Sequence, residues 1–172
     1  MTDPRAAALG RREALLAQMR NVARDVTGDE PVRRVHLTVA IDRFLVRLLA
    51  TTSWGAWVLK GGYANQLRHP GEARFTEDVD LWIDADIDTA TGMIAAAIAH
   101  GLDDTFAYEL PAPPRQLPGP PGGGLRFVVV ARLAGAELVR FKVDVSAQDD
   151  ITGELERHPS DPIVEHLGFE PA

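Results

Sequence analysis

Two aspartates, Asp78 and Asp80, stand at the start of an apolar segment, Val79 to Ile83, that is typical of a buried strand. Successive side chains of a strand point to opposite faces, so these two carboxylates share one face, about 7 Å apart, while Val79 and Leu81 point to the core. Neighbouring carboxylates repel each other unless a positive group lies between them. A divalent cation is the usual solution, because magnesium takes one or two carboxylates together with substrate phosphates.

A third aspartate lies on a segment with the same alternation. In RFKVDVS, residues 140–146, the apolar side chains share one face, and Asp144 shares the other with Lys142. If this strand lies beside the first, Asp144 meets Asp78 and Asp80. Three such carboxylates can hold two Mg²⁺ or Mn²⁺ ions, which orient an attacking hydroxyl and neutralise a triphosphate. An isolated pair of this kind is more often a polar strand end, and the third aspartate favours the metal site.

A pair of glycines supplies a second component. Gly61 and Gly62 follow a short apolar run, Trp57 to Leu59, and precede a short helix expected over residues 63–67. Glycine lets backbone N–H groups approach a phosphate closely, and a helix N-terminus adds partial positive charge. A tight turn between a strand and a helix needs glycine in any case, so the pair alone is weak support for a phosphate site.

The lysines add a modest indication of phosphate binding. The chain has two, Lys60 and Lys142, and its other cationic side chains, apart from histidine, are arginines. One adjoins the glycine pair and the other lies two residues from Asp144. A compact ammonium group is a good point charge for phosphate.

Composition limits the class of protein. The length of 172 residues suits one domain, and the absence of cysteine excludes disulfides and thiolate zinc sites. No apolar run is long enough to span a membrane and no secretion signal is visible, so we expect a cytoplasmic protein without a membrane partner. A net charge of −7 argues against a protein that coats nucleic acid. The arginines gathered in residues 5–47 are either solvated helix faces or a local phosphate-binding surface.

The elements that position these residues follow from periodicity and from turn residues. We expect helices over residues 5–25, 31–51 and 88–99, and strands over 57–59 and 79–83. A hairpin is expected from strands 125–133 and 137–145, and the Pro- and Gly-rich residues 111–124 are expected to form a flexible surface loop. This order predicts an α/β fold, a small mixed sheet with N-terminal helices packed on it. We expect residues 1–150 to form the domain and 151–172 a short polar tail.

Four segments together resemble a known family. LKGG, RFTEDVDLWI and the hairpin GGGLRFVVVARLAGAELVRFKVDVS, with the helix RRVHLTVAIDRFLVRLL before them, are similar to the AbiEii/AbiGii-type nucleotidyltransferase toxins of the DNA polymerase β-like superfamily. The similarity covers about residues 20–148. It implies that Asp78, Asp80 and Asp144 are catalytic and bind the metals, with Asp144 also activating the acceptor hydroxyl. The substrate-binding residues that it implies are Lys60, Gly61, Gly62, Arg74 and Lys142.

The resemblance also implies an activity and partners. The protein would be a metal-dependent nucleotidyltransferase and a toxin of a type IV toxin–antitoxin or phage-defence system. It would transfer a nucleotide from a nucleoside triphosphate to an RNA, the 3′ end of tRNA, and release pyrophosphate, and a cognate antitoxin would be its partner. In one departure from the family pattern, Tyr63 stands where a small or hydroxyl residue often follows the glycines.

Three other interpretations stay open from the residues. One is a catalytically decayed nucleotide- or protein-binding module of the same fold. Another is a sugar-nucleotide glycosyltransferase, which also uses a paired-aspartate motif, although the glycine turn and the third aspartate argue against it. The last is an antitoxin or interaction partner, for which the sequence offers no helix-turn-helix.

Overall fold

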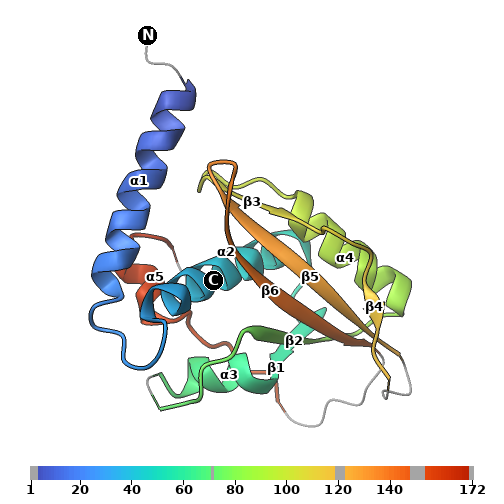
Figure 1. The fold of residues 1–172 in the computed structure, drawn as a ribbon. Coiled ribbons are helices and arrows are strands. Elements are labelled where there is room, and N and C mark those ends of the chain that lie inside the picture. Colours follow the sequence, from blue (N-terminus) through green and yellow to red (C-terminus); the bar gives the residue numbers. More distant parts are fainter. Residues whose placement is uncertain (1–3, 71, 119–122, 148–153, 171–172) are drawn as a thin grey trace.

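The computed structural model describes residues 4–70, 72–118, 123–147 and 154–170. It contains one sheet with helices packed against it (Figure 1). The helices are α1 (Pro4–Val22), α2 (Pro31–Thr51), α3 (Gly61–Arg68), α4 (Ile87–Ala99) and α5 (Pro162–His166). The strands are β1 (Trp57–Lys60), β2 (Asp78–Ile83), β3 (Phe106–Glu109), β4 (Arg115–Gln116), β5 (Gly124–Leu133) and β6 (Ala136–Ala147).

The sheet is mixed. Its strand order is β1-β2-β6-β5-β3, and β4 pairs with β5 beside this path. The neighbours β2 and β6 run parallel, whereas the other paired strands run antiparallel. The predicted fold class, a small mixed sheet with N-terminal helices packed on it, is therefore confirmed, and the two aspartate-bearing strands are direct neighbours.

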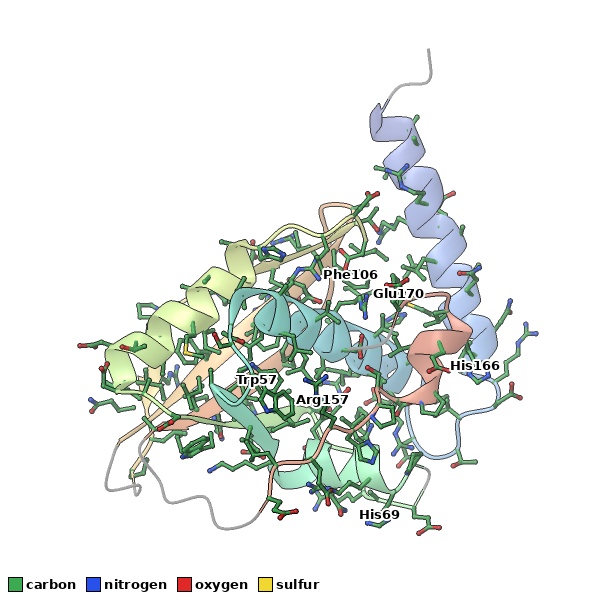
Figure 2. All side chains as sticks on the ribbon, turned by 180° about the vertical axis from the view of Figure 1, so that it is seen from behind. Trp57, His69, Phe106, Arg157, His166 and Glu170 are labelled. Carbon is green, nitrogen blue, oxygen red and sulfur yellow. The ribbon has the colours of Figure 1, made fainter. Side chains whose placement is uncertain are left out.

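One face of the sheet is covered by α2 and α4. The strands β5 and β6 lie in front of these helices in Figure 1, and the helices lie in front of the strands in the reverse view of Figure 2. The side chains of Leu37, Ile41 and Phe44 form the buried stripe of α2, and Val79 and Val143 meet them from the sheet without exposed surface. The opposite face of β2 and β6 therefore carries the half-buried and exposed polar side chains.

The hairpin between β5 and β6 has an irregular register. Its turn residues Ala134 and Gly135 both adopt positive φ, 48° and 82°, as a two-residue hairpin turn that matches strand twist requires. Leu133 pairs with Ala136, but the register shifts between Ala131 and Arg132, where β6 contributes one extra residue. Beyond such a bulge, each residue of one strand is paired with a different residue of the other strand than it would be without the bulge.

Two strands were not predicted. β3 offers only two buried positions, Phe106 and Tyr108, too short an alternation to recognise in the sequence. β4 lies inside the segment 111–124 expected to be loop throughout, and Gly124 already belongs to β5, which corrects that prediction. The prolines around β4 are tolerated because it pairs with β5 alone, and an edge strand needs fewer backbone donors.

The C-terminal segment contains a short helix, which the sequence did not indicate. Asp161 caps α5 by accepting a hydrogen bond from the backbone N–H of Ile163 at 3.0 Å. Val164 and Leu167 are buried, and α5 packs against α2. In Figure 2 the label of His166 lies beside α5, whereas that of Arg157 lies near Trp57. The domain boundary expected near residue 150 falls within residues 148–153, outside the described residues, and stays a prediction.

Two of the N-terminal arginines, Arg43 and Arg47, are buried, which corrects both interpretations of those positions, a solvated helix face and a phosphate-binding surface. The side chain of Arg47 is 1% exposed and its Nη2 lies 2.7 Å from Asp104 Oδ1. Arg47 also donates to the backbone oxygen of Phe106 at 3.0 Å. Arg43 pairs with Asp42 at 2.6 Å, again out of solvent. These guanidinium groups tie α2 to the chain around β3 and within the core, where no nucleic acid can reach them.

Within the described ranges, none of the helices combines the length and the apolar character needed to cross a membrane.

Candidate active site

The predicted aspartates meet in a charged row that crosses the open face of the sheet. Lys60 of β1 pairs with Asp80 of β2, Asp80 with Asp144 of β6, and Asp144 with Arg126 of β5. Paired residues of neighbouring strands project to the same face and come within interaction distance. Asp78 lies on the same face as Asp80, because the burial of β2 alternates residue by residue. The three aspartates therefore lie on one face of two neighbouring strands.

Asp80 lies against the glycine turn. Gly61 has a φ of +66°, and a Cβ built on it would lie 2.0 Å from Asp80 Oδ2, so only glycine fits there. The backbone N–H of Gly62 donates a hydrogen bond to this carboxylate. The first glycine, which begins α3, is thus needed for close approach to a carboxylate, and the second donates its backbone N–H to that carboxylate.

The pKa of Asp80 is raised by its surroundings. Burial is the largest cause, followed by the negative charges of Asp144 and Asp78, while Lys60 and the hydrogen bond from Gly62 act in the opposite direction. The single lysine and the backbone donor do not fully offset the crowding of carboxylates. A cation placed next to Asp80 would therefore favour its ionised form.

Asp144 is held by an arginine that the sequence reasoning missed. Arg126 donates from Nε to Oδ1 at 2.7 Å and from Nη2 to Oδ2 at 2.5 Å, a bidentate pair. Hydrogen bonding to Asp144 raises the pKa of Arg126 further, so its charge is permanent. A hairpin that kept the register of its turn would pair Asp144 with Leu125 instead. The bulge places Arg126 opposite Asp144, and no residue pattern in the sequence predicts this bulge.

The two lysines lie on the same face but point to different partners. Lys142 Nζ lies 3.3 Å from Asp78 Oδ1, and both side chains are partly exposed. Lys60 Nζ donates to Ser146 Oγ at 2.6 Å. Lys142 therefore stands beside the outer aspartate, whereas Lys60 reaches across β2 toward β6 and is not among the residues that line the adjoining cleft.

A cleft of about 550 Å³ adjoins the outer end of the row. It is bounded by the start of α3, by the segment before β2 and by β6. Its lining residues are Gly62, Asn65, Arg74, Phe75, Thr76, Glu77, Asp78 and Lys142. Four predicted site residues, Gly62, Arg74, Asp78 and Lys142, are thus brought together here. Gly61, Asp80 and Asp144 lie in the row next to it.

The start of α2 contacts two residues that line this cleft, Phe75 and Glu77. Arg33 makes two hydrogen bonds to the carboxylate of Glu77, one of them 2.7 Å from Nη2 to Oε2. The guanidinium of Arg34 stacks over the ring of Phe75, 4.6 Å from its centroid. These contacts fix the segment that carries Arg74. Arg33 and Arg34 belong to the helix segment that resembles the family, but the sequence does not show that Glu77 and Phe75 are their partners.

Tyr63, the departure from the family pattern, faces away from the cleft. Its side chain is 1% exposed, and burial together with Asp42 and Asp161 raises its pKa well above the usual value. The phenol is therefore a neutral core group, and the cleft is lined at this turn by backbone instead.

The carboxylates suit a divalent cation by their chemistry, because Mg²⁺ and Mn²⁺ prefer oxygen ligands and the set is crowded with negative charge. In the part of the chain that the structure describes, however, no three acidic or imidazole side chains converge as a ready metal site. The reason is visible in the contacts of two members: Asp144 is turned to Arg126, and Asp78 is turned to Lys142. A cation held by all three would have to draw these carboxylates from their present partners.

Comparisons with known proteins identify a family to which the sequence is similar. A family model described as "Nucleotidyl transferase AbiEii toxin, Type IV TA system" matches residues 43–172. Among solved structures, the crystal structure of JHP933 from Helicobacter pylori is similar at 22% identity, with a TM-score of 0.39. The match covers 64% of this chain and 42% of that one, so this chain spans less than half of that protein. No curated protein matches the sequence.

Proposed function

Because the chain belongs to the AbiEii family of nucleotidyl transferase toxins of type IV toxin–antitoxin systems, we propose that it transfers a nucleotide from a nucleoside triphosphate to an RNA. The acceptor proposed is the 3′ end of tRNA, and pyrophosphate is the second product. One observation carries this proposal: Asp80 and Asp144 are paired across two parallel strands, beside a glycine turn and a cleft that Arg74 and Lys142 help to line.

The cleft suits the triphosphate of the donor. Its cationic side chains, Arg74 and Lys142, line the cleft together with Gly62 near the N-terminus of α3. A helix N-terminus and cations that converge on one space are the usual means of binding phosphate. In this proposal Lys142 exchanges Asp78 for a phosphate oxygen when the donor binds.

The row of carboxylates suits the chemical step. Asp78, Asp80 and Asp144 would hold Mg²⁺ or Mn²⁺, and the bound cation would neutralise charge on the transferred phosphoryl group. Asp144 takes the proton of the acceptor hydroxyl. The hydroxyl oxygen then forms a bond to the α-phosphorus, the bond from that phosphorus to the bridging oxygen breaks, and pyrophosphate leaves with the electron pair. Because Arg126 now bonds both oxygens of Asp144, one of these hydrogen bonds is exchanged for the cation or the acceptor hydroxyl in this step.

The proposal includes the partners and the compartment that such a reaction needs. Nucleoside triphosphates and tRNA are cytoplasmic, so we place the activity there. As a member of a toxin family, the protein is proposed to pair with a cognate antitoxin that restrains transfer.

A transfer assay tests the proposal. The protein is incubated with Mg²⁺, bulk tRNA and each of the four α-labelled nucleoside triphosphates in turn, and wild type is compared with Asp80→Ala. We expect label on RNA with wild type and none with the variant. The bidentate Arg126–Asp144 pair is the one observation that favours a decayed nucleotide-binding module. Donor binding without any transfer by wild type would support that alternative and contradict the proposed reaction.

A further inference from the structure

The charged row continues past Arg126 to Arg115, a residue that has no role in the proposed reaction. Arg115 of β4 pairs with Arg126 of β5, which itself pairs with Asp144. Arg115 is exposed. Across five strands the row thus reads Lys60, Asp80, Asp144, Arg126, Arg115, and it ends in two adjacent guanidinium groups.

The charges at this end of the row are not balanced. Arg126 has the carboxylate of Asp144 as its counter-ion, but the side chain of Arg115 makes no hydrogen bond or ion pair with any of the described residues. Like charges placed directly opposite each other on neighbouring strands destabilise a sheet. Two cations thus lie side by side on a solvent-accessible face of the sheet, and Asp144 is the one carboxylate beside them. An anionic ligand would stabilise this arrangement.

The position of the pair separates this ligand from the donor. The cleft proposed for the triphosphate lies on the β2 side of the row, among Gly62, Arg74 and Lys142. The arginines lie on the opposite side of Asp144, and neither lines that cleft. Neighbouring strands are about 4.8 Å apart, so the backbone of Arg115 is roughly 10 Å from that of Asp144. An anion bound there is therefore close to the hydroxyl that Asp144 would deprotonate, but it is not the donor.

We propose that Arg115, together with Arg126, binds a backbone phosphodiester of the acceptor next to its attacking hydroxyl. The inference rests on the proposed function and names the residues that would bind its polynucleotide acceptor. A free sugar or the hydroxyl of a protein side chain brings no phosphate to this position. The planar fork of arginine suits a phosphodiester, because its parallel N–H groups match two phosphate oxygens. Arg115 is then a specificity residue for the acceptor.

Binding of RNA tests the assignment without relying on transfer. The probe is a fluorescent single-stranded RNA with a free 3′ hydroxyl, titrated at several salt concentrations, with wild type, Arg115→Ala, Arg115→Lys and Arg140→Ala. Arg140 is the matched control, an exposed arginine on the same strand as Asp144 that already pairs with Glu137. We expect Arg115→Ala to weaken binding about tenfold and Arg115→Lys to restore part of the affinity. The salt slope should fall by about 0.7 in Arg115→Ala, because the variant neutralises one phosphate fewer on a single strand.

A modified probe locates the phosphate that Arg115 binds. When the last phosphodiester of the RNA is replaced by an uncharged methylphosphonate, wild type should weaken as much as Arg115→Ala does with the normal probe. Arg115→Ala should weaken little further, because it has no arginine at this position to bind that phosphate. Equal binding by wild type and Arg115→Ala, an equal decrease in Arg140→Ala, or no binding of RNA by wild type would overturn the assignment. If wild type binds RNA as expected but labels none, the proposed transfer fails while the phosphate site stands.

Discussion

Gly61 is the residue at which the site tolerates least change. Its backbone is in the left-handed region, with φ +66°, and its missing side chain leaves the space that Asp80 Oδ2 occupies. A glycine pair in the sequence indicated a phosphate turn, and the structure adds a more specific reason for the first of the two. It is needed because a carboxylate lies against it.

We predict that Gly61→Ala lowers the free energy of unfolding by about 1–2 kcal/mol, the cost of a left-handed non-glycine residue. It should also remove transfer, because the new methyl group displaces the Asp80 carboxylate. Chemical denaturation and the RNA-labelling assay measure the two effects. Gly92→Ala in α4 is the control, since nothing lies within 4 Å of its added methyl group and alanine favours a helix. Wild-type transfer in Gly61→Ala would remove the turn from the site.

Asp80 is predicted to trade stability for function. Its pKa is raised by burial and by Asp144 and Asp78, so the folded state prefers the protonated carboxyl. A raised pKa in the folded state means that this state binds more protons than the unfolded state above the usual aspartate value. Stability contributed by the protonated group is therefore present at low pH and is lost as pH rises through the raised pKa.

In metal-free buffer, Asp80→Asn should consequently be more stable than wild type at pH 7, while transfer is abolished. The stability gain should shrink as pH falls toward the usual aspartate pKa, because wild type is then protonated as well. Thermal melts between pH 4 and pH 7 measure this. Asp84→Asn, at the exposed end of the same segment, should show neither effect. A variant that is less stable than wild type at pH 7 would contradict the strain ascribed to the row.

At the scale of elements, the sequence predicted the strands of the site better than their surroundings. The alternation in β2 and β6 predicted which face of its own strand each aspartate occupies, because burial of one strand face imposes period two, but the pairing of the two strands was an assumption. The pairing of Arg126 with Asp144 could not be predicted. It depends on one extra residue in β6, and a bulge leaves no distinctive residue pattern.

The arginines of α2 show a second limit of sequence reasoning. A helix rich in arginine suggested a phosphate-binding face, but Arg47 is buried and its partners are a carboxylate and backbone carbonyls about fifty residues away in the chain. The sequence pattern of an amphipathic helix is the same whether the guanidinium group of an arginine is solvated or paired with a buried carboxylate. Only the tertiary packing of β3 and the end of α4 on α2 distinguishes the two.

We predict that Arg47→Ala lowers the free energy of unfolding by about 3–5 kcal/mol, because it leaves the buried Asp104 without its counter-ion. Arg140→Ala, which removes an exposed pair with Glu137, should change it by less than about 0.5 kcal/mol. Urea denaturation of both variants measures the difference. An Arg47→Ala protein that is as stable as wild type but binds RNA more weakly would contradict this prediction and would indicate that Arg47 contacts RNA.

At the scale of the whole molecule, the site is assembled from segments far apart in the chain. The turn before α3, the start of β2, and strands β5 and β6 each supply part of it, and α2 and α4 hold them from the opposite face. The C-terminal segment also packs against α2 through α5, and its residues Val164 and Leu167 are buried. A few apolar residues between prolines carry too little periodicity to predict such docking.

The central claim is that Asp144, brought beside Asp80 by the parallel pairing of β2 and β6, takes part in nucleotidyl transfer. The most direct test is the rate at which Asp144→Asn labels RNA, measured beside its circular dichroism, thermal melt and donor binding. We predict a folded protein that still binds nucleoside triphosphate, with transfer reduced by about 10²–10⁴-fold, the usual range for removal of a general base. Transfer at the wild-type rate by the folded variant would contradict the account.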